Sequence, residues 1–321
     1  MDRDDRSNTG AWQGPKLSVD LAGVRLQNPL VLASGIWGSA AGTLARAGRA
    51  GAGAVTAKSC SIEPRRGHPN PTVLQWGHGL INAVGLSNPG AEEECRELQA
   101  AKEQLGGTGV ALIASVFGET PEAFAQAVLA LLPASVDLVE VNISCPNVAA
   151  ELGRPFALDP GPAASVTEAV RSVYSGPLLV KLSPNAPEIA QVARSVVEAG
   201  ADGLTVGNTL GPGMIIDLEA RRPVLSNRVG GVSGPAIRPI AVRCVYEVAA
   251  AVDVPIVGTG GVRTGADAME MIMAGATAVG IGSALEDEGE EVFGRITREL
   301  DQLMRQLGIK SLDEIRGCAH V

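Results

Sequence analysis

Polar side chains that could do chemistry recur at the ends of short apolar runs in this sequence. Lys58 and Lys181 each end such a run, and Cys145 stands within Asn-Ile-Ser-Cys-Pro-Asn (142–147). Burying an unpaired ammonium is costly, so each lysine should meet an anion or an electron-rich ring. For either lysine alone, extension of the side chain into solvent is an equally good interpretation. A cysteine is more often a small buried residue than a reagent, but the asparagines beside Cys145 favour a ligand site.

A second cysteine competes for a chemical role. Cys60 also follows an apolar run, whereas Cys95, Cys244 and Cys318 lie in helical or terminal contexts and are expected to be structural. The five cysteines are widely spaced, and none pairs with the three histidines at metal-ligand spacing. We therefore expect no disulfide framework, no metal site and no iron–sulfur cluster held by this chain.

Two glycine-rich segments could bind a phosphate. Gly-Thr-Gly-Gly (258–261) and Gly-Ile-Gly-Ser (280–283) each follow an apolar run. Successive glycines free backbone N–H groups to wrap an anion, and a helix start behind them adds its dipole. Neither segment fits a dinucleotide fingerprint or a P-loop. Ordinary turns are the alternative, but the presence of both segments favours phosphate binding.

The elements that must position these residues alternate along the chain. Eight short apolar or β-branched runs predict strands, at 29–35, 54–59, 110–116, 138–144, 178–183, 203–208, 255–258 and 278–282. Helical spacing predicts helices between and after them, at 91–105, 121–132, 162–174, 187–199, 239–251, 265–274 and 290–307. This alternation, preceded by a hairpin over 16–28, indicates an α/β protein with a (β/α)8 TIM barrel and an N-terminal β-hairpin. A doubly wound sheet is the alternative.

Composition excludes several other classes of protein. The 321 residues are 45% hydrophobic but only 3% aromatic, so Ala, Val, Leu and Ile must build the core, and disorder is excluded. The net charge of −9 and the absence of a basic cluster argue against nucleic-acid binding. No apolar stretch reaches the roughly 18 residues of a membrane helix. We expect a flexible tail over 1–15, one domain over 16–321, and a cytoplasmic location.

Several segments bring a known family into view. Residues 82–90 (Asn-Ala-Val-Gly-Leu-Ser-Asn-Pro-Gly), 142–147 and 180–185 (Val-Lys-Leu-Ser-Pro-Asn) resemble class 1 dihydroorotate dehydrogenases. So do 207–210 (Gly-Asn-Thr-Leu), 230–237 (Gly-Gly-Val-Ser-Gly-Pro-Ala-Ile) and 258–262 (Gly-Thr-Gly-Gly-Val). The resemblance runs in order from about residue 17 to residue 284.

The resemblance implies an FMN-containing barrel that oxidises dihydroorotate to orotate in pyrimidine (UMP) synthesis. It implies that Cys145 is the general base that takes a proton from C5, while C6 delivers hydride to the flavin. Lys181 is then expected near the flavin N1 region, where its charge stabilises the reduced ring. The substrate site is expected to comprise Lys58, Asn82, Ala83, Val84, Gly85, Leu86, Asn142, Asn208 and Thr209. The cofactor site is expected to comprise Ser34, Lys58, Ser59, Ser115, Asn142, Lys181, Val206, Gly234, Gly260, Gly261, Gly282 and Ser283.

The segment 148–160 resembles subclass 1B, in which NAD is the electron acceptor. That resemblance implies a partner subunit with FAD and a [2Fe–2S] cluster, joined to a homodimer of this chain as a heterotetramer. The chain departs from the family pattern at Ser115, where an asparagine that contacts FMN is usual, and at Thr72 and Gln75, where arginine and glutamate are expected.

Three other functions stay open. They are a fumarate-using class 1A dihydroorotate dehydrogenase, another FMN barrel acting on a related cyclic amide or enone, and an FMN-binding scaffold without turnover.

Overall fold

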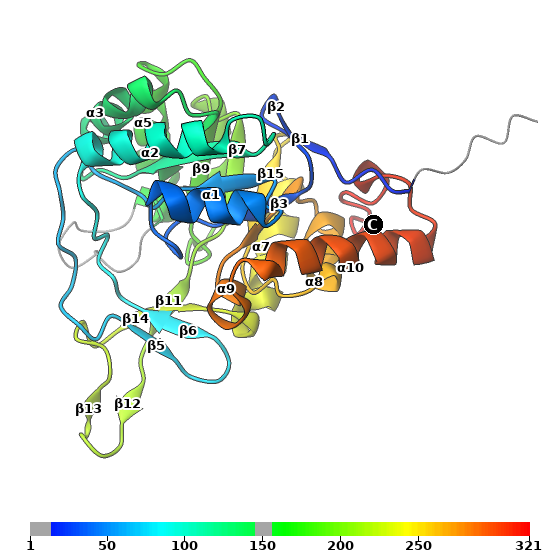
Figure 1. Cartoon of the computed structure of the whole chain (residues 1–321). Helices are drawn as coiled ribbons and strands as arrows, with labels where there is room; N and C mark the ends of the chain where they lie inside the picture. The colour runs from blue at the N-terminus through cyan, green and yellow to red at the C-terminus, as the bar shows by residue number, and fades with distance from the viewer. Residues whose placement is uncertain (1–13, 145–155) are drawn as a thin grey trace, which may run out of the picture.

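Eight parallel strands close into a barrel in the computed structural model, which describes residues 14–144 and 156–321 (Figure 1). Each barrel strand pairs with the next one along the barrel, and β16 pairs back with β3. The barrel strands are β3 (Leu30–Leu32), β4 (Ala54–Thr56), β7 (Ala111–Val116), β8 (Leu138–Asn142), β9 (Leu178–Leu182), β10 (Gly203–Val206), β15 (Ile256–Thr259) and β16 (Ala278–Ile281). The predicted barrel is therefore confirmed, and a doubly wound sheet is excluded.

Helices surround the barrel and bury it on its outer side (Figure 1). Because both faces of a parallel strand are covered, the strands are almost continuously apolar and buried. The helices are α1 (Ala41–Arg49), α2 (Ala91–Leu105), α3 (Pro121–Leu131), α5 (Pro160–Arg171), α6 (Ile189–Glu198), α7 (Arg238–Ala249), α8 (Gly265–Met273), α9 (Ala284–Glu288) and α10 (Glu291–Leu307). Of these, α1 and α9 were not predicted.

Local sequence signals explain several helix ends. Thr120 and Asp159 accept hydrogen bonds from backbone N–H groups at the starts of α3 and α5, and a proline follows each of them. Helix α10 ends at Gly308, whose φ of 71° belongs to the left-handed region that glycine adopts without strain.

The predicted N-terminal hairpin is also present. Strands β1 (Val19–Leu21) and β2 (Val24–Leu26) pair antiparallel, and Leu21 and Leu26 are fully buried in the main core. The Gln27 side chain donates to the Thr108 carbonyl, which fastens the hairpin beside the start of β7. The expected tail and domain limits stay predictions.

A second sheet, not predicted, is built from the connections that follow β4 and β10. Its strand order is β11 (Leu210–Gly213), β14 (Gly230–Ser233), β6 (Leu80–Asn82) and β5 (Val73–Gln75). Between β11 and β14 the chain extends as the arm (residues 214–229), which carries the short pair β12 (Ile216–Asp217) and β13 (Arg222–Pro223). Figure 1 shows this arm projecting away from the barrel.

No helix in the described ranges has both the length and the apolarity that crossing a membrane requires.

Candidate functional site

A cavity of about 250 Å³ opens at the carboxyl ends of the barrel strands. Its wall includes Val73 of β5 and Leu80 of β6, so the second sheet covers one side of the barrel mouth. In this fold the carboxyl ends of the strands are where catalytic groups gather. The cavity therefore lies where the sequence predicts the site.

Most of the predicted site residues line this one cavity. From the predicted substrate site, Lys58, Asn82, Val84, Gly85, Leu86, Asn142, Asn208 and Thr209 line it. From the predicted cofactor site, Ser34, Lys58, Ser59, Asn142, Lys181, Gly234, Gly260, Gly261, Gly282 and Ser283 line it.

Three predicted residues that the structure describes do not line the cavity. Ala83 and Val206 are fully buried, and Ser115 lies behind the wall with its hydroxyl bonded to Ser59 and Glu140. Cys145 lies outside the described residues. The roles assigned to these four residues stay predictions.

The two lysines reach the cavity from different strands of the barrel wall. Lys181 is 5% exposed on β9, and Lys58 follows β4. Neither ammonium pairs with a carboxylate within residues 14–144 and 156–321, whereas Lys102 pairs with Asp137 at 2.6 Å. Burial lowers the pKa of Lys58, and the negative charge of Glu94 acts in the opposite direction. Two cations without carboxylate partners make the cavity suited to an anionic or electron-rich ligand.

Cys60 is a poor candidate for a base. It is fully buried and is absent from the cavity lining, and burial together with the charge of Glu94 raises its pKa far above the ordinary value of a thiol. A thiol held in its protonated form cannot accept a proton.

Glu94, in the first turn of α2, is a buried acid whose charge interacts with Lys58. It is 1% exposed, and neither of its carboxylate oxygens has a hydrogen-bond partner among the described residues. Burial raises its pKa to about 7, the charge of Glu97 adds to the rise, and the nearby Ser39 hydroxyl and Lys58 oppose it.

We expect Glu94 to contribute a loss of stability as the pH rises from 4.5 to 7. In this range the Glu94 carboxyl is ionised in the unfolded chain but protonated in the folded one, so unfolding releases a proton. The loss amounts to about 3 kcal/mol in the free energy of unfolding. Glu94→Gln should lack this pH-dependent loss, so its free energy of unfolding at pH 8 should exceed that of the wild type. Urea denaturation at pH 5 to 8 measures the free energy of unfolding of both proteins.

Glu92→Gln is the matched control, because Glu92 lies in the same turn of α2 with its side chain 90% exposed. An equal pH slope in both variants and the wild type would contradict the raised pKa of Glu94.

Backbone amides make up the other end of the cavity. The N–H groups of Gly260, Gly261, Gly282 and Ser283 donate to no other described residue. Gly260 and Gly261 have φ values of 144° and 74°, which glycine tolerates without strain. The Thr259 hydroxyl beside them is buried without a partner among the described residues. Unused donors gathered at one place are typical of a phosphate site.

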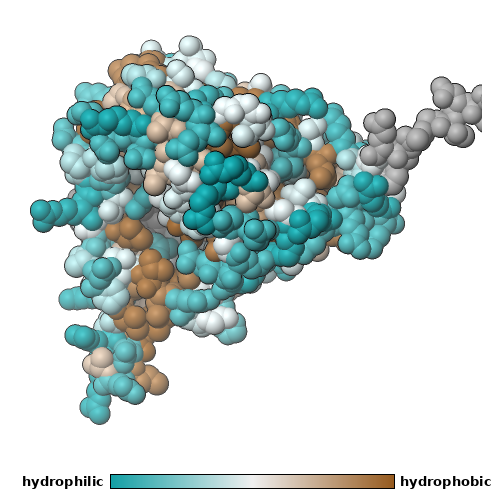
Figure 2. All heavy atoms as spheres, in the orientation of Figure 1, coloured by the Kyte–Doolittle hydropathy of each residue, from teal (hydrophilic) through white to brown (hydrophobic). Residues whose placement is uncertain are grey.

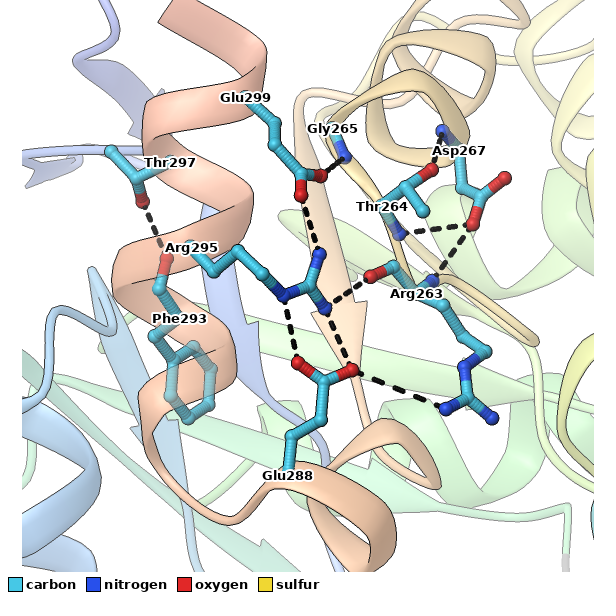
Figure 3. A network of polar contacts seen from close by, with 9 residues as sticks. All are labelled: Arg263, Thr264, Gly265, Asp267, Glu288, Phe293, Arg295, Thr297 and Glu299. Carbon is cyan, nitrogen blue, oxygen red and sulfur yellow. Dashed lines mark hydrogen bonds and ion pairs between the residues drawn. The ribbon is translucent and has the colours of Figure 1, made fainter.

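The start of α8 is not part of this phosphate site. Thr264 and Asp267 form a capping box, Asp267 also accepts from the Arg263 N–H, and Glu299 accepts from the Gly265 N–H. Figure 3 shows these carboxylates in place around the first turn. Acidic side chains thus already occupy the N-terminus of α8, whereas α9 begins directly after Ser283, so the expected contribution of a helix dipole to phosphate binding stays a prediction.

Arg295 holds the segment that follows the glycines (Figure 3). Its guanidinium donates to both oxygens of Glu288, at 2.7 and 2.8 Å, to Glu299 at 2.7 Å, and to the Arg263 carbonyl at 2.8 Å. Arg263 in turn pairs with Asp287 of α9 at 2.6 Å. The network thus joins α10 and α9 to the segment between Gly261 and α8.

We expect Arg295→Met to lower the free energy of unfolding by about 1–2 kcal/mol, because four charge-assisted hydrogen bonds of a partly exposed side chain are lost. Arg243→Met is the control, since Arg243 is more exposed and, within the described ranges, forms its ion pair with Glu247 alone. Guanidinium titrations of the two variants should differ clearly. Equal losses would show that the network adds nothing beyond a surface ion pair.

Side-chain amides also line the cavity. Asn142 and Asn208 are joined through the Ser144 hydroxyl, which donates to Asn142 Oδ1 at 2.8 Å and accepts from Asn208 Nδ2 at 2.8 Å. Amides fixed at a strand end can bind the carbonyl and carboxylate edges of a planar polar ring.

Some lining residues were not predicted. Gly35, Ile36, Gly207, Ser233, Thr259 and Glu286 also line the cavity. Thr259 lies between glycines in the segment 258–261, and this position was the sequence signal that could have identified it as a lining residue. Glu140, which lies beneath the cavity, could have been noticed as a lone acid within an apolar strand.

Comparison with known proteins gives the family. Residues 16–304 match the family model described as dihydroorotate dehydrogenase. Three relatives bear the name dihydroorotate dehydrogenase B (NAD(+)), catalytic subunit. The relative from Methanothermobacter thermautotrophicus is 47% identical over 304 residues, 95% of this chain and 98% of that protein. The relative from Methanocaldococcus jannaschii is 40% identical with the same coverage, and that from Alkaliphilus metalliredigens is 42% identical over 94% and 98%. The chain therefore belongs to the dihydroorotate dehydrogenase family.

Proposed function

We propose that this chain oxidises dihydroorotate to orotate in pyrimidine biosynthesis, as the catalytic subunit of an NAD-linked enzyme. Family membership and the names of the relatives support the reaction. The observation that carries the proposal is the cavity itself, which brings Lys58, Lys181, the amides and the free backbone N–H groups to one place.

The cavity fits FMN as the cofactor. The N–H groups of Gly260, Gly261, Gly282 and Ser283 would bind its phosphate, and the unpartnered Thr259 hydroxyl offers one more polar contact. A side chain at position 280 would collide with the Thr259 hydroxyl, so only a glycine leaves this wall open. Lys181 and Lys58 would lie beside the electron-rich ring. When bound, FMN accepts the hydride that leaves C6 of the substrate.

The residues of this chain supply the remaining chemistry. The Cys145 thiolate takes the proton from C5, so that loss of a proton and a hydride leaves the C5–C6 double bond of orotate. Asn142, Asn208 and Asn82 hold the carbonyl and carboxylate oxygens of the ring. Lys181 stabilises the negative charge that accumulates on the acceptor side during the transfer.

The electrons must then be transferred from the site to an acceptor. The relatives are named as catalytic subunits of NAD(+) enzymes, which supports a partner subunit with FAD and a [2Fe–2S] cluster in a heterotetramer. The isolated chain should therefore reduce NAD hardly at all. Fast turnover with fumarate would favour class 1A instead. Cys60, Cys95, Cys244 and Cys318 are free thiols, which fits the proposed cytoplasmic location.

A homodimer core is supported by the arm. Met214, Ile216 and Leu218 expose 51%, 47% and 86% of their surface there. Figure 2 shows apolar surface gathered along this extension. A projecting group of apolar side chains favours burial against a second copy.

We expect Leu218→Asp to convert the protein from twice the chain mass to the chain mass in light scattering. Leu307→Asp is the control, because Leu307 is 59% exposed at the end of α10, outside the arm. Unchanged mass for Leu218→Asp would exclude the arm as the dimer contact.

Anaerobic mixing of the FMN-loaded protein with dihydroorotate tests the reaction. We expect the flavin absorption band to bleach and orotate to form in equal amount. Bleaching by another cyclic amide but not by dihydroorotate would favour a different FMN barrel. Bound FMN that no substrate reduces would favour a scaffold, and a protein that cannot take up FMN would contradict the proposal as a whole.

A further inference from the structure

A continuous line of buried polar side chains runs from the cavity into the barrel interior. Asn142 Nδ2 donates to Ser59 Oγ at 2.9 Å, the Ser59 and Ser115 hydroxyls are 2.8 Å apart, and Ser115 Oγ donates to Glu140 Oε1 at 3.1 Å. The other carboxylate oxygen of Glu140 accepts from Thr205 Oγ1 at 2.7 Å. The five side chains are between 1% and 7% exposed.

Strand register explains how the line forms. Glu140 and Asn142 are two apart on β8, so they point to the same side, one layer below the other. Ser115 is the register partner of Glu140 on β7. Thr205 lies on β10, beyond β9, so the Glu140 carboxylate reaches across the interior of the barrel.

The carboxylate sets the direction of every hydrogen bond in the line. A carboxylate only accepts, and a serine hydroxyl has one hydrogen to donate. Because the hydrogen of Ser115 goes to Glu140, Ser59 must donate to Ser115. Ser59 therefore has only lone pairs left for Asn142, which must turn its Nδ2 toward Ser59 and its Oδ1 away.

The same order of hydrogen-bond donors and acceptors continues from Asn142 to a second amide, that of Asn208. Asn142 Oδ1 accepts from both the N–H and the hydroxyl of Ser144, at 3.2 and 2.8 Å. The Ser144 oxygen then accepts from Asn208 Nδ2, and Asn208 Oδ1 accepts from the Thr209 N–H at 2.8 Å. Both amide oxygens are thus engaged, and each amide nitrogen keeps one N–H for the cavity that it lines.

We propose that Glu140 is a positioning residue, which through Ser115 and Ser59 helps to fix the amide of Asn142 as a hydrogen-bond donor toward the cavity, next to Asn208, which the Thr209 N–H orients in the same sense. The ligand at these amides must then present acceptors, that is, carbonyl or carboxylate oxygens. Identifying that ligand with orotate rests on the proposed function. The orientation of the amides as hydrogen-bond donors does not rest on it. An asparagine amide has nearly the same shape in either orientation. The Ser144 N–H selects the same orientation of Asn142 from the other side, so the line to Glu140 supplies the second of two contacts that oppose a reversed amide.

Four variants of the FMN-loaded protein test the proposal. Ser115→Ala and Glu140→Met interrupt the line without altering a side chain that lines the cavity. Thr205→Val removes the other hydroxyl from the same carboxylate and leaves the line to Asn142 intact, so it is the matched control. Glu140→Gln can keep an oxygen toward Ser115 and should restore most of the wild-type behaviour.

Ligand preference is the first measurement. Orotate and its 6-carboxamide differ in that the amide puts N–H groups where orotate has only acceptors. We expect Ser115→Ala and Glu140→Met to lower the preference for orotate over the carboxamide by about tenfold, as one lost hydrogen bond predicts. Thr205→Val and Glu140→Gln should keep it. A merely structural role would lower the thermal stability of all the variants without changing this ratio.

The side-chain amide resonances of Asn142 give a second measurement that needs no ligand. In ¹⁵N-labelled protein, the proton that Asn142 donates to Ser59 should move upfield in Ser115→Ala and Glu140→Met but not in Thr205→Val. If this shift occurs and neither pyrimidine binds, the proposed function fails while the positioning role stands. Unchanged resonances together with an unchanged ligand ratio would overturn the positioning role.

Discussion

Replacing Cys145 with serine should slow the reduction of FMN by dihydroorotate by about a hundredfold to ten thousandfold at neutral pH. A hydroxyl is a far weaker proton acceptor than a thiolate, so the rate should continue to rise into more alkaline solution than in the wild type. FMN content and orotate affinity should change little, because only one atom is exchanged. Anaerobic stopped-flow measurements across the pH range test this.

Cys60→Ser provides the control for that experiment. The Cys60 thiol is buried and keeps its proton, so this variant should reduce FMN at the wild-type rate if it folds normally. Slow reduction in Cys60→Ser together with normal reduction in Cys145→Ser would show that Cys60, and not Cys145, is the base.

Replacing Lys181 with methionine should slow flavin reduction by about a hundredfold and weaken FMN binding. Methionine keeps the apolar stem of the side chain and removes the charge, so the packing within β9 is preserved. The loss follows from the position of this ammonium, which is 5% exposed, lines the cavity and has no carboxylate partner in the described residues.

The reduction potential of the bound flavin gives an independent measure of the same charge, because a lost cation makes the flavin harder to reduce. Lys310→Met, which removes a lysine outside the cavity lining, should change neither the rate nor the potential. A Lys181→Met protein that retains FMN and reduces it at the wild-type rate would remove Lys181 from the mechanism.

The barrel could be predicted from the sequence because its signals are local. Each of the eight strands is a short apolar run, and helices such as α2 and α8 have clear periodicity and ends. The predicted run at 29–35 is longer than β3, which ends at Leu32. Beyond it the chain turns outward, and Gly35, with φ of 89°, lines the cavity.

Elements that depend on distant partners were missed for a physical reason. Helix α1 contains Gly42 and Gly48, which weaken its intrinsic helix propensity, and it is held by the burial of Leu44 against the core. The strands of the second sheet are three or four residues long, and Gly231 pairs with Asn82 across about 150 positions of sequence. No local pattern reports such a pairing.

In the site, too, residues with a local sequence signal were predicted and a residue that depends on distant partners was missed. Residue types at strand ends predicted the two lysines and the amides, since polar groups there have a clear reason to exist. The role of Glu140 was missed, because its partners Ser115 and Thr205 come from other strands and only the register brings them together.

The second sheet limits how this protein can be redesigned. Because β6 and β14 are hydrogen-bonded neighbours, the connections after β4 and β10 cannot be exchanged one at a time as independent modules. A graft that replaces one of them with a loop from a relative leaves the other with an unpaired strand edge over the cavity. Swapping both together should preserve activity where single swaps do not. Substitutions in these two segments should therefore show strong epistasis, although they lie far apart in the sequence.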